Sequence, residues 1–184
     1  DVVGGGAPKG LCGSGLLDLA AVLLEREVIT PGGRLLPPEE APAEMRRWLE
    51  RDAHGNGVFR LTPEVALTAE DVRALQLAKA AVAAGIQVLL ERRGIAADKL
   101  DGVYLAGGFG NYLDPKSAVR IGMLPEACAG RLHSLGNSAL AGASMLALDG
   151  RRWAEIGALT RSCQSITLSG NPDFNNAFAA HMPF

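Results

Sequence analysis

The stretch VYLAGGFGNYLD at residues 103–114 decides the fold class. Its first four residues form a short apolar run between Gly102 and Gly107, which is typical of a buried strand. The glycines that follow allow backbone angles and a close approach that a Cβ would forbid. Asp114 and Pro115 then supply a side-chain N-cap and a proline at the first helical position. The stretch therefore predicts a strand, a glycine turn and the start of a helix.

Two interpretations of this glycine turn are open. A phosphate would fit there, because a helix start offers free N–H groups and a positive dipole end, and open α/β sheets bind ligands at the carboxyl ends of their strands. A tight turn without a ligand explains the same residues. Two common nucleotide motifs do not decide the matter, since the Walker loop is absent and the dinucleotide pattern lacks its acidic residue about 20 positions further on.

The composition excludes several functional classes. The 184 residues, 48% hydrophobic and 21% charged, suffice for one core-forming domain or two small lobes. A net charge of -2 favours neither a nucleic acid nor an anionic membrane surface as partner. No apolar run reaches the length of a membrane span and no signal peptide is present, so we expect no membrane association. The first residues, which include no Met, resemble a strand already under way, and we expect a fragment of a longer chain.

The cysteines and histidines predict no metal site in this chain. Cys12, Cys128 and Cys163 are far apart and form neither a C-x-x-C pair nor a ferredoxin run, and the three histidines are scattered. Such cysteines fit a reduced, cytoplasmic protein. With no histidine nearby in sequence, Cys12 is expected to be a small buried residue rather than a nucleophile.

The order of the predicted elements indicates an α/β fold. We expect a helix at 16–26 capped by Ser14, a small inserted subdomain at about 30–67, and a long helix from Thr68 to residue 93. Thr68 and Asp71 form a variant capping box, and Gly94 ends the long helix. Further strands are expected at 133–135 and 166–168, and helices at 138–148, 152–160 and 172–180.

Two further groups of residues are candidates for a ligand site. Gln76 and Lys79 lie one turn apart on a helix otherwise suited to burial, so they form either a solvated face or a hydrogen-bonding pair toward a ligand. The sequence Gly13-Ser14-Gly15 before a helix is either a plain capped turn or a phosphate-binding loop.

Four stretches together resemble one family. They are residues 10–18 (GLCGSGLLD), residues 67–81 (LTAEDVRALQLAKAA), residues 103–125 from the central strand to IGMLP, and residues 136–143 (GNSALAGA). In this order they are similar to the carboxy-terminal domain of the reductive activators of corrinoid proteins, which are members of the actin-like ATPase superfamily. The resemblance runs over nearly the whole chain.

This resemblance implies a ribonuclease H-like lobe, with residues 1–184 as the second lobe of an actin-like ATPase core. Such activators use ATP to drive reduction of Co(II) to Co(I) on a corrinoid protein that serves a methyltransferase. The resemblance places Mg-ATP between two lobes, with Gly107, Gly108 and Asn111 at its adenosine side, Gln76 and Lys79 near adenine, and Gly13, Ser14 and Gly15 near the phosphates or the hinge. It implies a [2Fe–2S] ferredoxin domain elsewhere in the full-length protein.

The chain also departs from a complete activator. The cluster cysteines and the first-lobe phosphate loop are missing, and Asp18, Asp71 and Asp114 all have adequate capping or first-turn roles, so no catalytic residue is assigned. We expect the fragment alone to be inactive. A small-molecule kinase of the same superfamily and a non-enzymatic domain for docking or homodimerisation are the alternatives.

Overall fold

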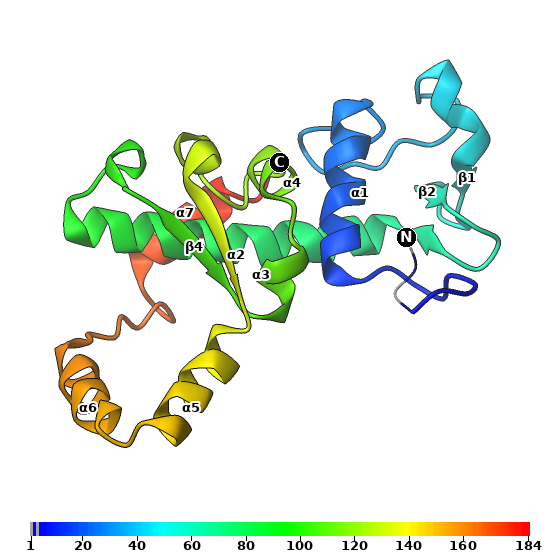
Figure 1. The fold of residues 1–184 in the computed structure, drawn as a ribbon. Coiled ribbons are helices and arrows are strands. Elements are labelled where there is room, and N and C mark those ends of the chain that lie inside the picture. The colour runs from blue at the N-terminus through cyan, green and yellow to red at the C-terminus, as the bar shows by residue number, and fades with distance from the viewer. Residues whose placement is uncertain (1, 3) are drawn as a thin grey trace.

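The computed structural model describes residue 2 and residues 4–184, except for the side chains of Phe109 and Asn111. The helix α2 (Ala69–Arg93) runs through the domain, and the other elements are arranged around it (Figure 1). The helix α1 (Gly13–Glu25) crosses α2, whereas α7 (Pro172–Ala180) packs along it. The fold is α/β and mixes these helices with two small sheets.

The ends of α2 are set by its own sequence, as predicted. The backbone N–H of Thr68 donates to Oδ2 of Asp71 at 2.9 Å, and the N–H of Asp71 donates to Oγ1 of Thr68 at 3.2 Å. This capping box satisfies two N–H groups that the first helical turn leaves unpaired. At the other end Gly94 adopts the left-handed conformation, with φ of 62°.

The apolar composition of α2 corrects one expectation from the sequence. By length and composition alone this helix of 25 residues is apolar enough to cross a membrane, although no apolar run of that length was predicted. Within the domain it serves as a core helix, because Val72, Leu75, Ala80, Ala84 and Val88 are buried against neighbouring elements. Such core helices pass the same test of length and composition.

The helix α1 supplies much of the hydrophobic core but starts earlier than predicted. Leu17, Ala20 and Leu23 are buried, and they join residues of α2 and of the α4 region in one cluster. The predicted N-cap Ser14 is wrong, because Cys12 caps the helix and Gly13 already lies in it. Ser14 takes a helical conformation instead, so the cap lies two residues upstream.

The region of the predicted insertion contains a sheet of its own. The 3₁₀ turn η1 (Ala43–Trp48) leads into β1 (Leu49–Arg51), followed by β2 (Gly57–Arg60) and β3 (Ala66–Leu67). The three strands pair antiparallel in chain order. Leu49, Phe59 and Leu67 point into the core cluster that also contains α1, so this sheet packs on the rest of the domain.

The second sheet is parallel and contains the strand predicted at residues 103–106. β4 (Val103–Ala106) pairs with β5 (Leu132–Gly136). The connection between them contains α3 (Gly108–Tyr112), α4 (Pro115–Arg120) and the 3₁₀ turn η3 (Glu126–Arg131), and η2 (Ala97–Lys99) precedes β4. As predicted, Asp114 caps α4, because its Oδ2 accepts the N–H of Ser117 at 3.0 Å. The glycine turn itself is shorter than expected, since α3 begins directly at Gly108.

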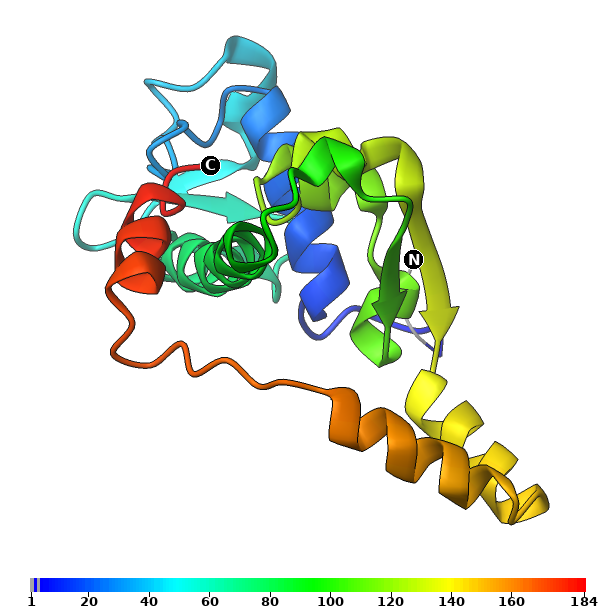
Figure 2. The same ribbon diagram turned by 90° about the vertical axis from the view of Figure 1, so that its left-hand side faces the viewer.

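After β5 the chain leaves the body of the domain. α5 (Ser138–Leu148) and α6 (Arg152–Ser162) form a hairpin that stands apart, and residues 163–171 return from it to α7 (Figure 2). The strand predicted at 166–168 is wrong, because these residues form no regular element. A strand needs a neighbour for its hydrogen bonds, and within the described chain no strand lies beside this segment.

Candidate functional site

Two glycine turns meet where β4 and β5 end. Gly107 and Gly108 follow β4, whereas Gly136 ends β5 and is followed by Asn137, which caps α5. Parallel strands end at the same edge of a sheet, so the two turns become neighbours. The N–H of Gly107 donates to the carbonyl oxygen of Gly136 at 2.7 Å. We call residues 107–108 and 136–137 the glycine edge.

The glycine edge has an open side. Gly107 has φ of 98° and ψ of 169°, a combination that is essentially restricted to glycine. A Cβ built on Gly107 or on Gly108 would meet no heavy atom of the described residues within 4 Å, so none of these residues fills the space in front of either glycine. Gly110 differs, because a Cβ there would lie 3.3 Å from the backbone of Leu105. Gly110 therefore serves packing, whereas Gly107 and Gly108 leave room for another molecule.

The first turn of α1 lies toward the same end of the domain. It contains the predicted residues Gly13, Ser14 and Gly15. α1 contacts α3, and both views show α3 between the start of α1 and the ends of the two strands (Figures 1 and 2). The fold thus brings together two stretches of the predicted site that are more than 90 positions apart in sequence.

Cys12 has a different role from the one expected. It is exposed rather than buried, and it caps α1 by accepting the N–H of Gly15 on Sγ at 3.4 Å. Its Sγ also lies 3.4 Å from Oγ of Ser14. The hydroxyl of Ser14 and then the N–H of Gly15 lower the pKa of the Cys12 thiol, because both can donate to the thiolate. Cys12 borders a pocket of about 640 Å³ that Lys9, Leu61 and Val65 also line.

One acidic residue beside this turn has an unmet acceptor. Asp18 lies one helical turn beyond Ser14, and its Oδ1 is buried without a hydrogen-bond partner among the described residues. Buried carboxylate oxygens normally accept hydrogen bonds. The sequence predicts only a first-turn role for Asp18, and no sequence signal indicates this unpaired oxygen.

The structure places Gln76 against two other segments of the domain. Its side chain is 4% exposed, and Nε2 donates to the carbonyl oxygens of Gly32 at 3.1 Å and of Met182 at 3.0 Å. These bonds tie the turn at residues 30–34 and the residues after α7 to the middle of α2. Gln76 thus stabilises the tertiary arrangement.

Lys79, one turn further along α2, binds the same C-terminal residues. Its Nζ donates to the carbonyl oxygen of Pro183 and lies 5.4 Å from the centre of the Phe184 ring. The side chain is 1% exposed, and burial lowers the pKa of Lys79 because the charged amine loses its hydration. The placement of Gln76 and Lys79 at adenine stays a prediction, and the side chain of Asn111 lies outside the described residues.

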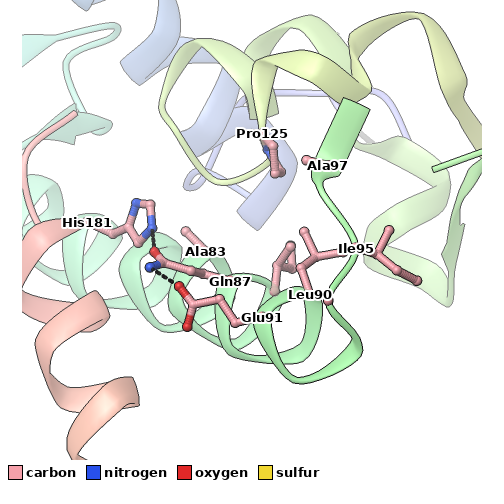
Figure 3. Close-up of a pocket in the computed structure, with 10 residues that line it drawn as sticks. Ala83, Gln87, Leu90, Glu91, Ile95, Ala97, Pro125 and His181 are labelled. Carbon is pink, nitrogen blue, oxygen red and sulfur yellow. Dashed lines mark hydrogen bonds between the residues drawn. The ribbon is translucent and has the colours of Figure 1, made fainter. Parts of the chain in front are cut away.

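A separate pocket of about 340 Å³ lies between the second half of α2, Pro125 and the end of α7 (Figure 3). Its polar side carries a chain of hydrogen bonds. Nε2 of Gln87 donates to Oε1 of Glu91 at 2.8 Å, and Oε1 of Gln87 accepts from Nε2 of His181 at 2.8 Å. The pocket contains none of the predicted site residues, and its hydrogen bonds fix α7 on α2. Across the described chain, no three His, Cys, Asp or Glu side chains gather into a metal site.

Comparison with known proteins identifies the family. A family model described as the C-terminal domain of RACo, the ASKHA domain, matches residues 1–184. The chain belongs to this RACo C-terminal domain family. The match covers the whole chain, and the resemblance of the four sequence stretches runs over nearly all of it.

Individual relatives agree with the family. The RACo domain is 33% identical over 192 residues to the corrinoid activation enzyme RamQ of Eubacterium limosum, covering 100% of this chain and 32% of RamQ. It is 27% identical over 131 residues to a [Co(II) methylated amine-specific corrinoid protein] reductase of Methanosarcina barkeri, covering 70% of this chain and 24% of that protein. A solved reductive activator for corrinoid, iron-sulfur protein superimposes with a TM-score of 0.85 at 32% identity, over 98% of this chain and 29% of that one. The chain thus spans about a third or less of these relatives.

The backbone of Gly107 gives a first testable prediction for this RACo domain. Gly107→Ala should lower the free energy of unfolding by about 1–3 kcal/mol, because alanine is strained at φ of 98° and ψ of 169°. Gly108→Ala is the matched control and should change it by less than about 1 kcal/mol, since no positive φ applies there and its Cβ meets open space. Urea denaturation monitored by circular dichroism measures the free energy of unfolding of both variants. An equal decrease in the two would contradict the conclusion that only position 107 requires glycine.

The cap of α1 gives a second prediction. In a Cys163→Ser variant, Cys12 is the one exposed thiol. The pH at which its alkylation by iodoacetamide reaches half the maximal rate should be lower than the corresponding pH for an ordinary cysteine. Ser14→Ala should move that midpoint upward, because the hydroxyl that stabilises the thiolate is lost. Ser165→Ala, in the exposed segment after α6, is the control. Overlapping profiles for the parent and Ser14→Ala would refute this account.

Lys79 gives a third prediction, which concerns pH. Burial lowers the pKa of Lys79 in the folded state. At pH values between this lowered pKa and the ordinary pKa near 10.4, the unfolded chain therefore binds more protons than the folded chain. The free energy of unfolding should therefore rise with pH across this interval. Lys79→Met should remove this contribution, whereas Lys9→Met, at an exposed lysine, should not. Parallel pH dependences for the parent and Lys79→Met in urea titrations would contradict it.

Proposed function

We propose that this domain binds Mg-ATP in a longer protein that reduces the cobalt of a corrinoid protein from Co(II) to Co(I). The family and the activities for which the relatives are named support reductive corrinoid activation as the setting. The corrinoid partner would then serve a methyltransferase. Three free cysteines without a disulfide suit a reducing compartment, and we place the protein in the cytoplasm.

The open side of the glycine edge carries the nucleotide part of this proposal. In the described part of the chain no atom lies within 4 Å of a Cβ built on Gly107 or Gly108, so the sugar and the α-phosphate of a nucleotide can approach the backbone closely. Ligands of α/β folds lie at this end of parallel strands. These residues fit a nucleotide, and the first turn of α1 with Gly13, Ser14 and Gly15 lies on the same side of the domain.

Gln76 and Lys79 fit the nucleotide less directly. Their donor groups already bind the carbonyl oxygens of Gly32, Met182 and Pro183, so contact with adenine would require other groups of these side chains or release of the C-terminal residues. We therefore assign adenosine binding chiefly to the glycine edge, with α2 as its rigid support.

The electron itself comes from outside the domain. Reduction of Co(II) to Co(I) takes one electron, and the resemblance implies a [2Fe–2S] cluster elsewhere in the longer protein as its donor. This domain would contribute ATP binding. The free energy available to drive the unfavourable reduction is then limited by the difference in ATP affinity between the two conformations of the protein. The site would be completed by residues of the other lobe, so we expect weak binding by this chain alone.

A docking domain is the second candidate, favoured by one observation. The hairpin of α5 and α6 contains no buried residue, although it carries several large apolar side chains. This surface needs a partner whether or not the domain binds a nucleotide.

Calorimetric titration with Mg-ATP tests the nucleotide proposal, using this chain and the longer protein. Gly108→Arg should fill the open side of the glycine edge and raise Kd by at least about tenfold, a change of about 1.4 kcal/mol. Gly130→Arg is the control, because Gly130 is an exposed glycine with open space around it in η3. The absorbance of the corrinoid partner reports its ATP-dependent reduction. The rate of this reduction should fall in Gly108→Arg and stay unchanged in Gly130→Arg. Unchanged ATP binding in Gly108→Arg would reject the glycine edge as the site.

A further inference from the structure

The composition of α5 does not match its surroundings. Its sequence SALAGASMLAL contains no charged residue, and large apolar side chains occur around the helix. Leu148 is 87% exposed, Leu140 63% and Met145 49%. A helix that is apolar all round belongs in the core of a larger structure or in a membrane. Eleven residues cover about 17 Å, which is too short for a bilayer of about 30 Å, so a core is the better match.

The rest of the described domain does not provide that core. α6 is the element that packs against α5, and it is exposed as well, with Trp153 63% and Leu159 64% exposed. Both views show the hairpin standing away from α2 and α7, joined to the domain through β5 and residues 163–171 (Figures 1 and 2). The missing neighbours of α5 must therefore come from other polypeptide.

An independent observation comes from the sheet of β4 and β5. Tyr104 and His133 are opposite each other in the parallel register, and their rings stack with centroids 5.3 Å apart. Tyr104 is 64% exposed, and Leu135, two residues beyond His133, is 54% exposed. Parallel sheets are normally covered on both faces, and two strands alone are marginal. One face of this sheet is therefore uncovered, and β5 leads directly into α5.

We propose that α5 and the uncovered face around Tyr104, His133 and Leu135 are core surfaces, covered in the intact protein by the polypeptide that precedes this domain. The matched family is a C-terminal domain, and the chain spans about a third of its relatives, so most of such a protein lies upstream. The absence of charge on α5 argues for permanent intramolecular packing, because transient partners dock on more polar surfaces. This inference does not depend on nucleotide binding.

Hydrogen exchange measured by mass spectrometry tests the proposal on both the 184-residue chain and the longer protein. The amides of residues 141–148 should exchange at least about 100-fold more slowly in the longer protein. Residues 83–90 of α2, already packed in this domain, are the internal control and should change far less. Oxidative footprinting of Met145 and Trp153 should slow in the same comparison.

A pair of variants adds a test of energetics. Leu140→Gln should leave the Tm of the isolated chain unchanged, because Leu140 is exposed there, and should lower the Tm of the longer protein by several degrees. Leu89→Gln is the matched control, a half-exposed leucine on α2, and should have little effect on either. Equal exchange of residues 141–148 in both proteins would overturn the proposal. Protection of α5 in the isolated chain that grows with its concentration would also overturn it, by identifying a second copy as the occupant.

Discussion

The close packing of α2 is the constraint on which the rest of this domain depends. Small residues on its buried side, including Ala80, Ala83, Ala84 and Gly85, let neighbouring elements approach its backbone. A Cβ at Gly85 would lie in ordinary van der Waals contact with the side chain of Leu168, at 3.6 Å, in the segment that leads back to α7. Because interiors are packed nearly as densely as crystals, such a helix fixes the positions of its neighbours closely. α1 and α7 are both placed by contact with it.

Two buried polar side chains turn this packing into a specific arrangement. Gln76 and Lys79 bind backbone carbonyls of the turn near residue 32 and of residues 182–183. A buried donor that lost these acceptors would keep its desolvation cost, so alternative positions of the C-terminal residues are disfavoured. The same residues that resemble an adenine contact thus hold together three segments far apart in the chain.

The glycine edge depends on a backbone hydrogen bond. The hydrogen bond from Gly107 to Gly136 joins the two parallel strand ends, and it links the proposed nucleotide turn to the segment that starts α5. The surfaces beyond this bond remain open, both in front of the glycines and around the hairpin. These two open surfaces agree with the proposal that other polypeptide completes this domain on more than one side.

Features that depend only on neighbouring residues could be predicted from the sequence. Thr68 with Asp71, Gly94 and Asp114 mark helix ends because caps act within one turn. The run at 103–106 is a strand as predicted, but the expected burial is wrong, because Tyr104 and Ala106 are exposed and the other two residues are only partly buried. The strand at 166–168 failed because a strand needs a partner, and Ser14 failed because Cys12 could cap the helix from two residues upstream. By contrast, the hydrogen bond between Gly107 and Gly136 is visible only in the folded domain. The same is true of the bonds from Gln76 and Lys79 to residues more than 100 positions away. Those contacts depend on the chain closing long loops, and no local pattern encodes which distant carbonyl a buried donor will meet.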